Sequence, residues 1–168
     1  MYFPGGELKQ GRIVNVAGLE APFDVEIDAQ NRVWVSNSAG DTVIRFPKDD
    51  PTKVETFRAG ISVHAMAIDT KGNVWVTSNA SPDFPLPKVP PGVSQMEQWK
   101  IQLGAIFKAV VVEGKKTGIV SMIRPDGTQP VPGGFTGGGV IVVPWGINID
   151  GNDDVWVASS PTKQLVYM

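Results

Sequence analysis

The sequence contains no cysteine, only one histidine and no long hydrophobic run, and each absence excludes a class of function. Without cysteine, disulfide bonds, thiolate metal sites and a cysteine nucleophile are excluded, although the cellular compartment is not fixed. No apolar run approaches the roughly 20 residues that span a bilayer, so we expect no membrane partner. Residues 1–6 also lack the charged and then apolar layout of a signal peptide.

An excess of charge of one sign is also missing, because 15 basic and 17 acidic residues leave a net charge of -2. This balance gives no electrostatic reason to bind nucleic acid, so we expect no nucleic acid among the partners. The composition, with 42% hydrophobic and 19% charged residues, is typical of a globular chain. The 19 glycines and 14 prolines indicate many turns.

One phrase occurs three times along the chain. Each copy begins with alternating or β-branched residues, reaches an aspartate, and resumes as Val-Trp-Val, with the aspartate six residues before the tryptophan. The copies are residues 21–35, 63–76 and 144–157. The first interval is close to forty residues, which indicates a repeat architecture.

Each copy predicts two short antiparallel strands joined by a tight turn. Asp28, Asp69 and Asp150 are predicted to clamp these turns by bonding the backbone of the residues that follow. Segments 41–46 and 53–57 read as two further strands, which makes a four-stranded unit.

In the Val-Trp-Val strand the tryptophan points to one face of the sheet and the valines to the other, so both faces are apolar. Short four-stranded units buried on both faces are typical of the blades of a β-propeller. The alternative is a β-sandwich of about seven strands, which offers no reason for a repeated phrase. We therefore predict an all-β fold, an incomplete β-propeller of four-stranded blades.

The repeats resemble the NHL-type repeats of bacterial propellers, and in particular the streptogramin (virginiamycin B) lyases. The resemblance rests on the pattern Pro-x-Gly-Ile-x-Ile-Asp at 144–150, on Asn-Val-Trp-Val at 73–76, and on the glycine-rich approach at 135–139. It covers about residues 11–79 and 117–168. It implies the fold more strongly than the activity, because related propellers include lyases, lactonases and binding platforms.

The predicted blades cover residues 22–57, 63–135 and 144–168, preceded by a leading strand at 12–16. Because propellers close with four to eight blades, we expect this chain to be a fragment of a longer protein or to self-associate through its open blade edges. A degenerate extra blade hidden between Asp69 and Asp150 is the alternative.

Residues 80–117 read instead as an insertion between the second and third strands of the second blade. A proline-rich connector at 81–92 precedes a capping box that begins at Ser94 and predicts a helix start. Apolar residues at spacings of three and four then give this helix one apolar face. Residues 109–112 are the ambiguous part, since they also fit a strand. The helix is either a lid or wall of a site, or a plug that patches the rim.

The start of the first strand and the end of the second strand of each blade meet at one rim of the propeller, because neighbouring strands run antiparallel. Phe23, His64 and Trp145 share one repeat position at this rim, the predicted channel mouth. The second strands end there in serine and asparagine, which makes Asn37, Asn79 and Ser159 candidate ligand-binding residues. We expect a small molecule or a protein ligand at the channel mouth.

His64 is the candidate catalytic residue, because imidazole titrates near neutrality without assistance. Its place resembles the position of an active-site histidine in the streptogramin lyases, which use more than one histidine, whereas Phe23 and Trp145 fill the equivalent places here. The alternative is an ordinary loop histidine. A complete lyase site is therefore not present in these residues.

Phe23 and Trp145 are either stacking surfaces for a ligand ring or core residues. Glu26 is the candidate metal ligand, because one glutamate with asparagine oxygens fits a hard cation such as Mg²⁺ or Ca²⁺. Two functions of different classes follow from these residues. The first is a ligand- or partner-binding propeller, and the second is a lyase or lactonase that uses His64.

Overall fold

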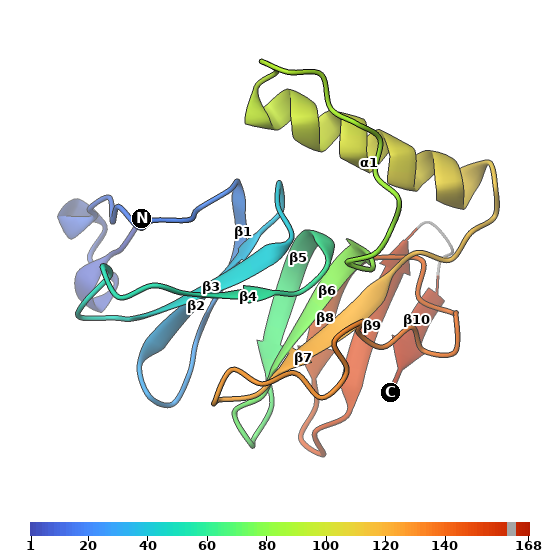
Figure 1. The fold of residues 1–168 in the computed structure, drawn as a ribbon. Coiled ribbons are helices and arrows are strands. Elements are labelled where there is room, and N and C mark those ends of the chain that lie inside the picture. The colour runs from blue at the N-terminus through green and yellow to red at the C-terminus, as the bar shows by residue number, and fades with distance from the viewer. Residues whose placement is uncertain (161–163) are drawn as a thin grey trace.

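Three small antiparallel sheets lie side by side in the computed structural model, which describes residues 1–160 and 164–168 (Figure 1). The sheets have the strand orders β1-β2-β3-β4, β5-β6-β7 and β8-β9-β10. The strands are β1 (Pro22–Ile27), β2 (Arg32–Asn37), β3 (Thr42–Pro47), β4 (Glu55–Arg58), β5 (Ile61–Ile68), β6 (Val74–Ala80), β7 (Ile119–Ile123), β8 (Val143–Ile149), β9 (Val155–Ser160) and β10 (Gln164–Tyr167). We call the sheets blades 1, 2 and 3. The fold is an incomplete β-propeller, as the sequence predicts.

The recurring phrase folds into the same turn in all three blades. The tryptophan indole N–H donates to the second carboxylate oxygen of the aspartate, at 2.8 Å in blade 1 and 3.0 Å in blades 2 and 3. The first carboxylate oxygen accepts the backbone N–H groups two and four residues later. The residue three positions after the aspartate has positive φ, and it is Asn31, Gly72 and Asp153 in turn. The predicted clamping role of the three aspartates is confirmed.

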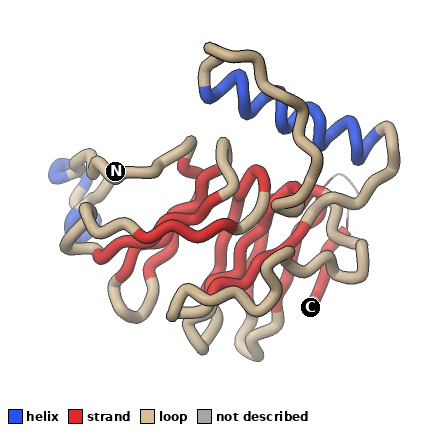
Figure 2. Tube along the Cα trace, viewed as in Figure 1, coloured by secondary structure: helices blue, strands red, loops and turns tan. Residues whose placement is uncertain are grey.

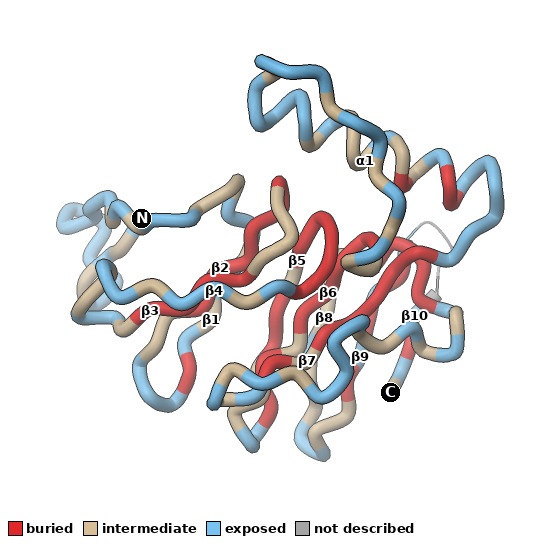
Figure 3. Tube along the Cα trace, in the orientation of Figure 1, coloured by how far each residue is buried: buried red, intermediate tan, exposed pale blue. Residues whose placement is uncertain are grey.

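Each blade has two apolar faces because side chains alternate along its strands. We call the side that carries the tryptophan the Trp face, and the side that carries the flanking valines the Val face. Trp34 and Val43 of blade 1 pack against Met66, Val74 and Val76 on the Val face of blade 2. Blade 2 meets blade 3 in the same way, through the residues Trp75, Val120, Ile147, Ile149, Val155 and Val157. The core of the molecule is therefore a series of Trp-face to Val-face contacts. The buried residues follow the strands of the blades (Figure 3).

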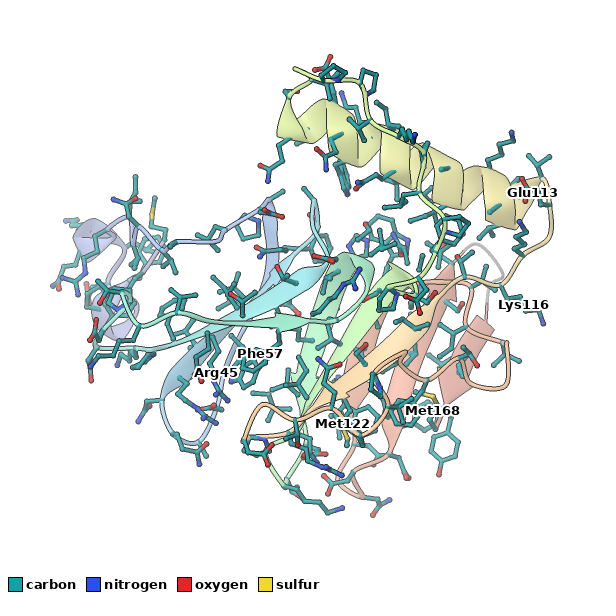
Figure 4. The ribbon with its side chains drawn as sticks, viewed as in Figure 1. Arg45, Phe57, Glu113, Lys116, Met122 and Met168 are labelled. Carbon is teal, nitrogen blue, oxygen red and sulfur yellow. The ribbon has the colours of Figure 1, made fainter. Side chains whose placement is uncertain are left out.

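A buried arginine, Arg45, makes hydrogen bonds that link blades 1 and 2. The Arg45 guanidinium donates to both carboxylate oxygens of Glu55, at 2.8 and 2.9 Å, and to the backbone carbonyl of Pro125 at 2.8 Å. Its Cζ atom lies 4.8 Å from the ring centre of Trp34 and 4.9 Å from that of Phe57, beside which it is seen in Figure 4. A charge this deeply buried is tolerated because it is both paired and stacked.

Two predicted strands are not formed. Residues 12–16 make no strand, and only Arg12 pairs, through an isolated bridge to Tyr2. Short 3-10 helices at Pro4–Gly6 and Leu8–Gln10 precede them. The segment lacks a neighbouring strand edge, and Val16 packs instead on the Val face of blade 1.

In blade 2 the expected fourth strand is reduced to one bridge between Val120 and Phe135. The segment around Phe135 is rich in glycine and proline, which weaken strand pairing. Blades 2 and 3 therefore have three strands each among the described residues, whereas blade 1 has four.

The insertion between β6 and β7 forms helix α1 (Gln95–Val111), which crosses the end of the blades opposite the aspartate turns (Figures 1 and 2). Ser94 and Glu97 make the predicted capping box: the Ser94 hydroxyl accepts the Glu97 N–H, and the Glu97 carboxylate accepts the Ser94 N–H. Ile106, Ala109 and Val110 are its buried residues. The ambiguous segment 109–112 is therefore helical as far as Val111 and forms no strand.

Candidate functional site at the channel mouth

The three residues that share one repeat position meet at the rim beneath helix α1. The His64 ring centre lies 4.2 Å from that of Trp145, at a tilt of 30°, and 4.9 Å from that of Phe23, in an edge-on contact at 79°. Phe23 and Trp145 are 6.2 Å apart. We call these three residues the aromatic cluster. The fold brings together residues that stand 41 and 81 positions apart in the sequence.

The cluster forms because the first strand of every blade is irregular at this point. The pairing register shifts between Pro22 and Val25 in β1, between Val63 and Met66 in β5, and between Pro144 and Gly146 in β8. Such bulges change the direction of side chains and are frequent beside functional sites. The bulges are held by side chains of the second strand: the Ser36 hydroxyl accepts the Asp24 N–H at 3.0 Å, and the Thr77 hydroxyl donates to the Ala65 carbonyl at 3.2 Å.

His64 is buried, with 0% of its surface exposed, and one side of its ring is held by polar groups. The Asn79 amide nitrogen lies 2.8 Å from His64 Nε2, and the Ser62 hydroxyl lies 3.2 Å from the same atom. With the Asn79 amide in this orientation its NH₂ group can only donate, so Nε2 accepts and the ring proton is assigned to Nδ1. Asn79 also donates to Ser62 at 3.3 Å.

Burial lowers the pKa of His64 from 6.5 to about 4. The charged imidazolium loses its hydration here, and burial is the only cause of the shift. The imidazole is therefore neutral at pH 7, and a catalytic role for His64 stays a prediction.

Three buried polar atoms in this region have no hydrogen-bond partner in the described residues: His64 Nδ1, Ser78 Oγ and Asn79 Oδ1. Buried polar atoms are nearly always satisfied, and a buried donor without an acceptor costs about 1–3 kcal/mol. The aromatic cluster thus combines an apolar surface with a hydrogen-bond donor, His64 Nδ1–H, that no group among the described residues accepts.

Helix α1 covers one side of the cluster. Its Phe107 and Val110 pack with Trp145, Val142 and Val143, and its Ile106 packs with Ile61. The Trp99 indole N–H donates to the Ser62 hydroxyl at 3.4 Å, which links the helix to the polar side of His64. Phe23 is 52% exposed, so the cluster opens to solvent on the side of blade 1. The helix is therefore a wall of the candidate site.

Two other candidate ligand-binding residues are engaged in structural hydrogen bonds. The Asn37 amide donates to the Gly18 carbonyl at 2.8 Å and accepts the Glu20 N–H at 2.9 Å, which ties down the loop before β1. The Ser159 hydroxyl accepts the Val142 N–H at 2.9 Å. Asn79, in contrast, contacts the aromatic cluster through its hydrogen bond to His64.

Glu26 lies beside Asp24 on β1, and its pKa is raised by burial and then by the negative charge of Asp24. Asp24 itself accepts the backbone N–H of Met66 in blade 2 at 2.7 Å. The described residues contain no group of three His, Cys, Asp or Glu side chains that could hold a metal ion. The divalent cation stays a prediction without a ligand set in this part of the chain. Among the same residues, no helix has the length and apolarity needed to cross a membrane.

Sequence reasoning missed Ser62 and the hydrogen bond that it accepts from Trp99. Ser62 has φ of 56°, a left-handed conformation that is uncommon outside glycine, and Ala21 at the equivalent position of blade 1 has φ of 51°. No residue preference predicts this geometry. Ser62 stands two residues before His64, and this closeness in the sequence is the signal that could have marked it as a site residue.

No family model matches the sequence, and no curated protein matches it either. Solved structures do match by fold. One is a catalytically inactive H270A form of virginiamycin B lyase from Staphylococcus aureus, with quinupristin. It is 14% identical over 92% of this chain and 43% of its own length, with a TM-score of 0.53. Another is a gluconolactonase-like protein, 12% identical over 88% of this chain and 48% of its own, with a TM-score of 0.51.

Identities this low show the fold and not the activity. The chain spans less than half the length of each of these two structures. The predicted resemblance to the streptogramin lyases is confirmed at the level of architecture, whereas the NHL label stays a prediction. In fold, the three blades of this chain resemble blades of the streptogramin lyase-like β-propellers.

Proposed function

We propose that the chain is a ligand-binding propeller module whose aromatic cluster binds a small molecule with a flat ring and a hydrogen-bond acceptor. The observation that carries the proposal is the state of His64. Asn79 occupies its Nε2 atom, the pKa of the ring is about 4, and within the described residues its Nδ1–H donor has no acceptor.

These properties suit recognition better than proton transfer. A general base requires a free lone pair, and it works best with a pKa near the working pH. A neutral imidazole with its lone pair engaged offers instead an N–H donor, which a ligand reaches once the side chains that cover the ring move aside. Aromatic rings at 4 to 6 Å spacing favour edge-on or stacked contacts with a further ring. Phe23, which is half exposed, is the surface that such a ring meets first.

The second candidate function is a lyase or lactonase that uses His64. It is supported by the fold shared with virginiamycin B lyase and with the gluconolactonase-like protein. In that case His64 has to leave Asn79 during the reaction.

Titration with quinupristin and, separately, with phenol, indole and gluconolactone decides between the two candidates. Binding is followed by tryptophan fluorescence, and turnover by chromatography of the added compound. The binding proposal expects saturable fluorescence changes without product, lost in Phe23→Ala and kept in a Val112→Lys control at the exposed end of the helix. Product formation that disappears in His64→Ala would establish the enzyme instead.

A further inference from the structure

Inside the chain, the Trp face of one blade packs on the Val face of the next. The two terminal blades each expose one of these two kinds of surface. Trp34 on the Trp face of blade 1 is 0% exposed, whereas the equivalent Trp156 of blade 3 is 37% exposed. Beside it on the same face, Leu165 is 65% and Tyr167 is 57% exposed. In blades 1 and 2 the residues at the position of Leu165, Val43 and Val120, are fully buried.

Blade 1 exposes residues of its Val face. Val25 and Ile27 lie on its Val face, because they pair with Val35 and Val33, and they are 58% and 52% exposed. The equivalent residues of blade 2, Met66 and Ile68, pack against the Trp face of blade 1. The chain therefore carries an exposed Trp face at one end and, at the other, a Val face that is exposed along β1 while its Val35, Ile44 and Phe46 are buried beside Val16 and Leu19.

The segment that makes no strand also fits this scheme. Val16 stands seven residues before Phe23, as Phe57 of the fourth strand stands seven residues before His64. Val16 packs on the Val face of blade 1, just as Phe57 packs with the cluster that contains the Val face of blade 2. Residues 12–16 thus lie where the fourth strand of a preceding blade would lie, and blade 3 has three strands among the residues that the structure describes.

We propose that two copies of this chain associate head to tail, with the Trp face of blade 3 of each copy on the Val face of blade 1 of the other. Residues 12–16 of one copy then add to β10 of its partner as a fourth strand, by main-chain hydrogen bonding to the open edge. By analogy with the pairing of Val43 and Phe57, Leu165 of one copy faces Val16 of the other.

A second copy fits these faces because each half of the contact repeats one that the chain already makes twice internally. A contact between unlike surfaces forms a closed ring when its rotation closes, and otherwise an open filament. Two copies of three blades give six, which lies within the four to eight blades of closed propellers. The ring leaves neither apolar face exposed to water.

Light scattering after gel filtration of the 168-residue chain tests the assembly. The proposal expects twice the chain mass of 18.0 kDa. Leu165→Lys on the Trp face and Ile27→Lys on the Val face are each expected to give monomers, while the control Val112→Lys remains a dimer. Circular dichroism checks that each variant is folded, which is expected because all three side chains are exposed.

Mixing the two variants tests directly whether the Trp face of one copy pairs with the Val face of the other. A Leu165→Lys copy keeps an intact Val face and an Ile27→Lys copy keeps an intact Trp face, so an equimolar mixture is expected to regain a dimer. A monomeric wild-type chain, dimers that survive both substitutions, a control that dissociates, or a mixture that stays monomeric would each overturn the proposal. The first of these results would assign the open faces to further blades of a longer polypeptide.

Disulfide trapping gives an independent readout, because the chain has no cysteine of its own. A mixture of Val16→Cys and Leu165→Cys copies is expected to form the mixed disulfide in excess over either homodimer, since directly opposite residues bring their Cβ atoms within about 5.5 Å. Equal amounts of the three products would contradict the strand addition.

Discussion

The molecule has two rims: one carries the aspartate turns, which we call the turn rim, and the other is the channel mouth. The same three repeats contribute to the two rims in different ways. At the turn rim, Asp and Trp recur in every blade and make the same hydrogen bonds each time. At the channel mouth, one repeat position holds Phe23, His64 and Trp145, and the three side chains converge. The repeated Asp and Trp residues stabilise each blade at the turn rim. The different residues at one repeat position of the channel mouth form the aromatic cluster.

The turn rim is expected to show the largest effect on stability. Asp28→Ala leaves the buried Trp34 indole N–H without its acceptor and removes the partner of Arg32, which donates to Asp28 at 2.7 Å. We expect a loss of about 3 kcal/mol in the free energy of unfolding, measured with urea. The pKa of Asp28 is lowered because hydrogen bonds from Trp34 and Arg32 outweigh the opposing effect of burial. This direction indicates that the charged form is the one the fold stabilises.

The matched substitution Asp150→Ala breaks the same turn in blade 3, where Trp156 is partly exposed and water replaces the lost acceptor. We expect a loss of about 1 kcal/mol. Equal losses at the two positions would show that burial of the neighbouring tryptophan does not set the strength of the clamp.

Replacing Asn79 by Asp tests whether the residue beside His64 at the channel mouth controls the pKa of the ring. A carboxylate 2.8 Å from His64 Nε2 favours the imidazolium, because opposite charges this close stabilise each other where water is excluded. We expect the pKa of His64 to rise by about two, followed by nuclear magnetic resonance of the imidazole protons. A pKa that stays near 4 would mean that the hydrogen bond to Asn79 does not control the state of the ring.

The buried imidazole also makes stability depend on pH. The pKa of His64 is about 4 in the folded protein and 6.5 in the unfolded chain, so the unfolded chain binds more protons between these values. Stability contributed by the neutral ring is therefore complete above pH 6.5 and falls as the pH drops towards 4. Between pH 7 and pH 5 we expect His64 to account for a loss of about 2 kcal/mol.

Comparison with His64→Phe isolates this contribution, because the remaining titrating groups are common to both chains. The two free energies of unfolding are measured at pH 7 and at pH 5. Identical pH dependence in both proteins would contradict the assignment of the loss to His64.

Phe23→Ala is expected to have the smallest effect on stability, below about 1 kcal/mol, because half of this side chain is exposed. Its effect on ligand binding is expected to be a complete loss of the fluorescence change. A large loss of stability would assign Phe23 to the core, which was the alternative interpretation of the aromatic residues.

Local chemistry explains which features the sequence predicted. Asp28, its turn and Trp34 lie within seven residues, so short-range hydrogen-bonding rules and strand alternation were sufficient for the blades. The capping box at Ser94 is equally local.

The state of His64 was not predictable in the same way. It depends on Phe23, Trp145 and helix α1, which approach from other parts of the chain and together remove water from the ring. The missing strand at 12–16 has the same origin, since a strand requires a partner edge and not only a suitable composition.

The linear order of the blades has a consequence for how the molecule comes apart. Blade 2 is covered on both sides, whereas blades 1 and 3 each have a single neighbour. In such quasi-one-dimensional arrays, interface energies add between nearest neighbours, so in a single copy of the chain the terminal units open before the central one. Amide hydrogens of β5 and β6 should then exchange last, and the imidazole loses Phe23 and Trp145, its neighbours from blades 1 and 3, before its own blade opens.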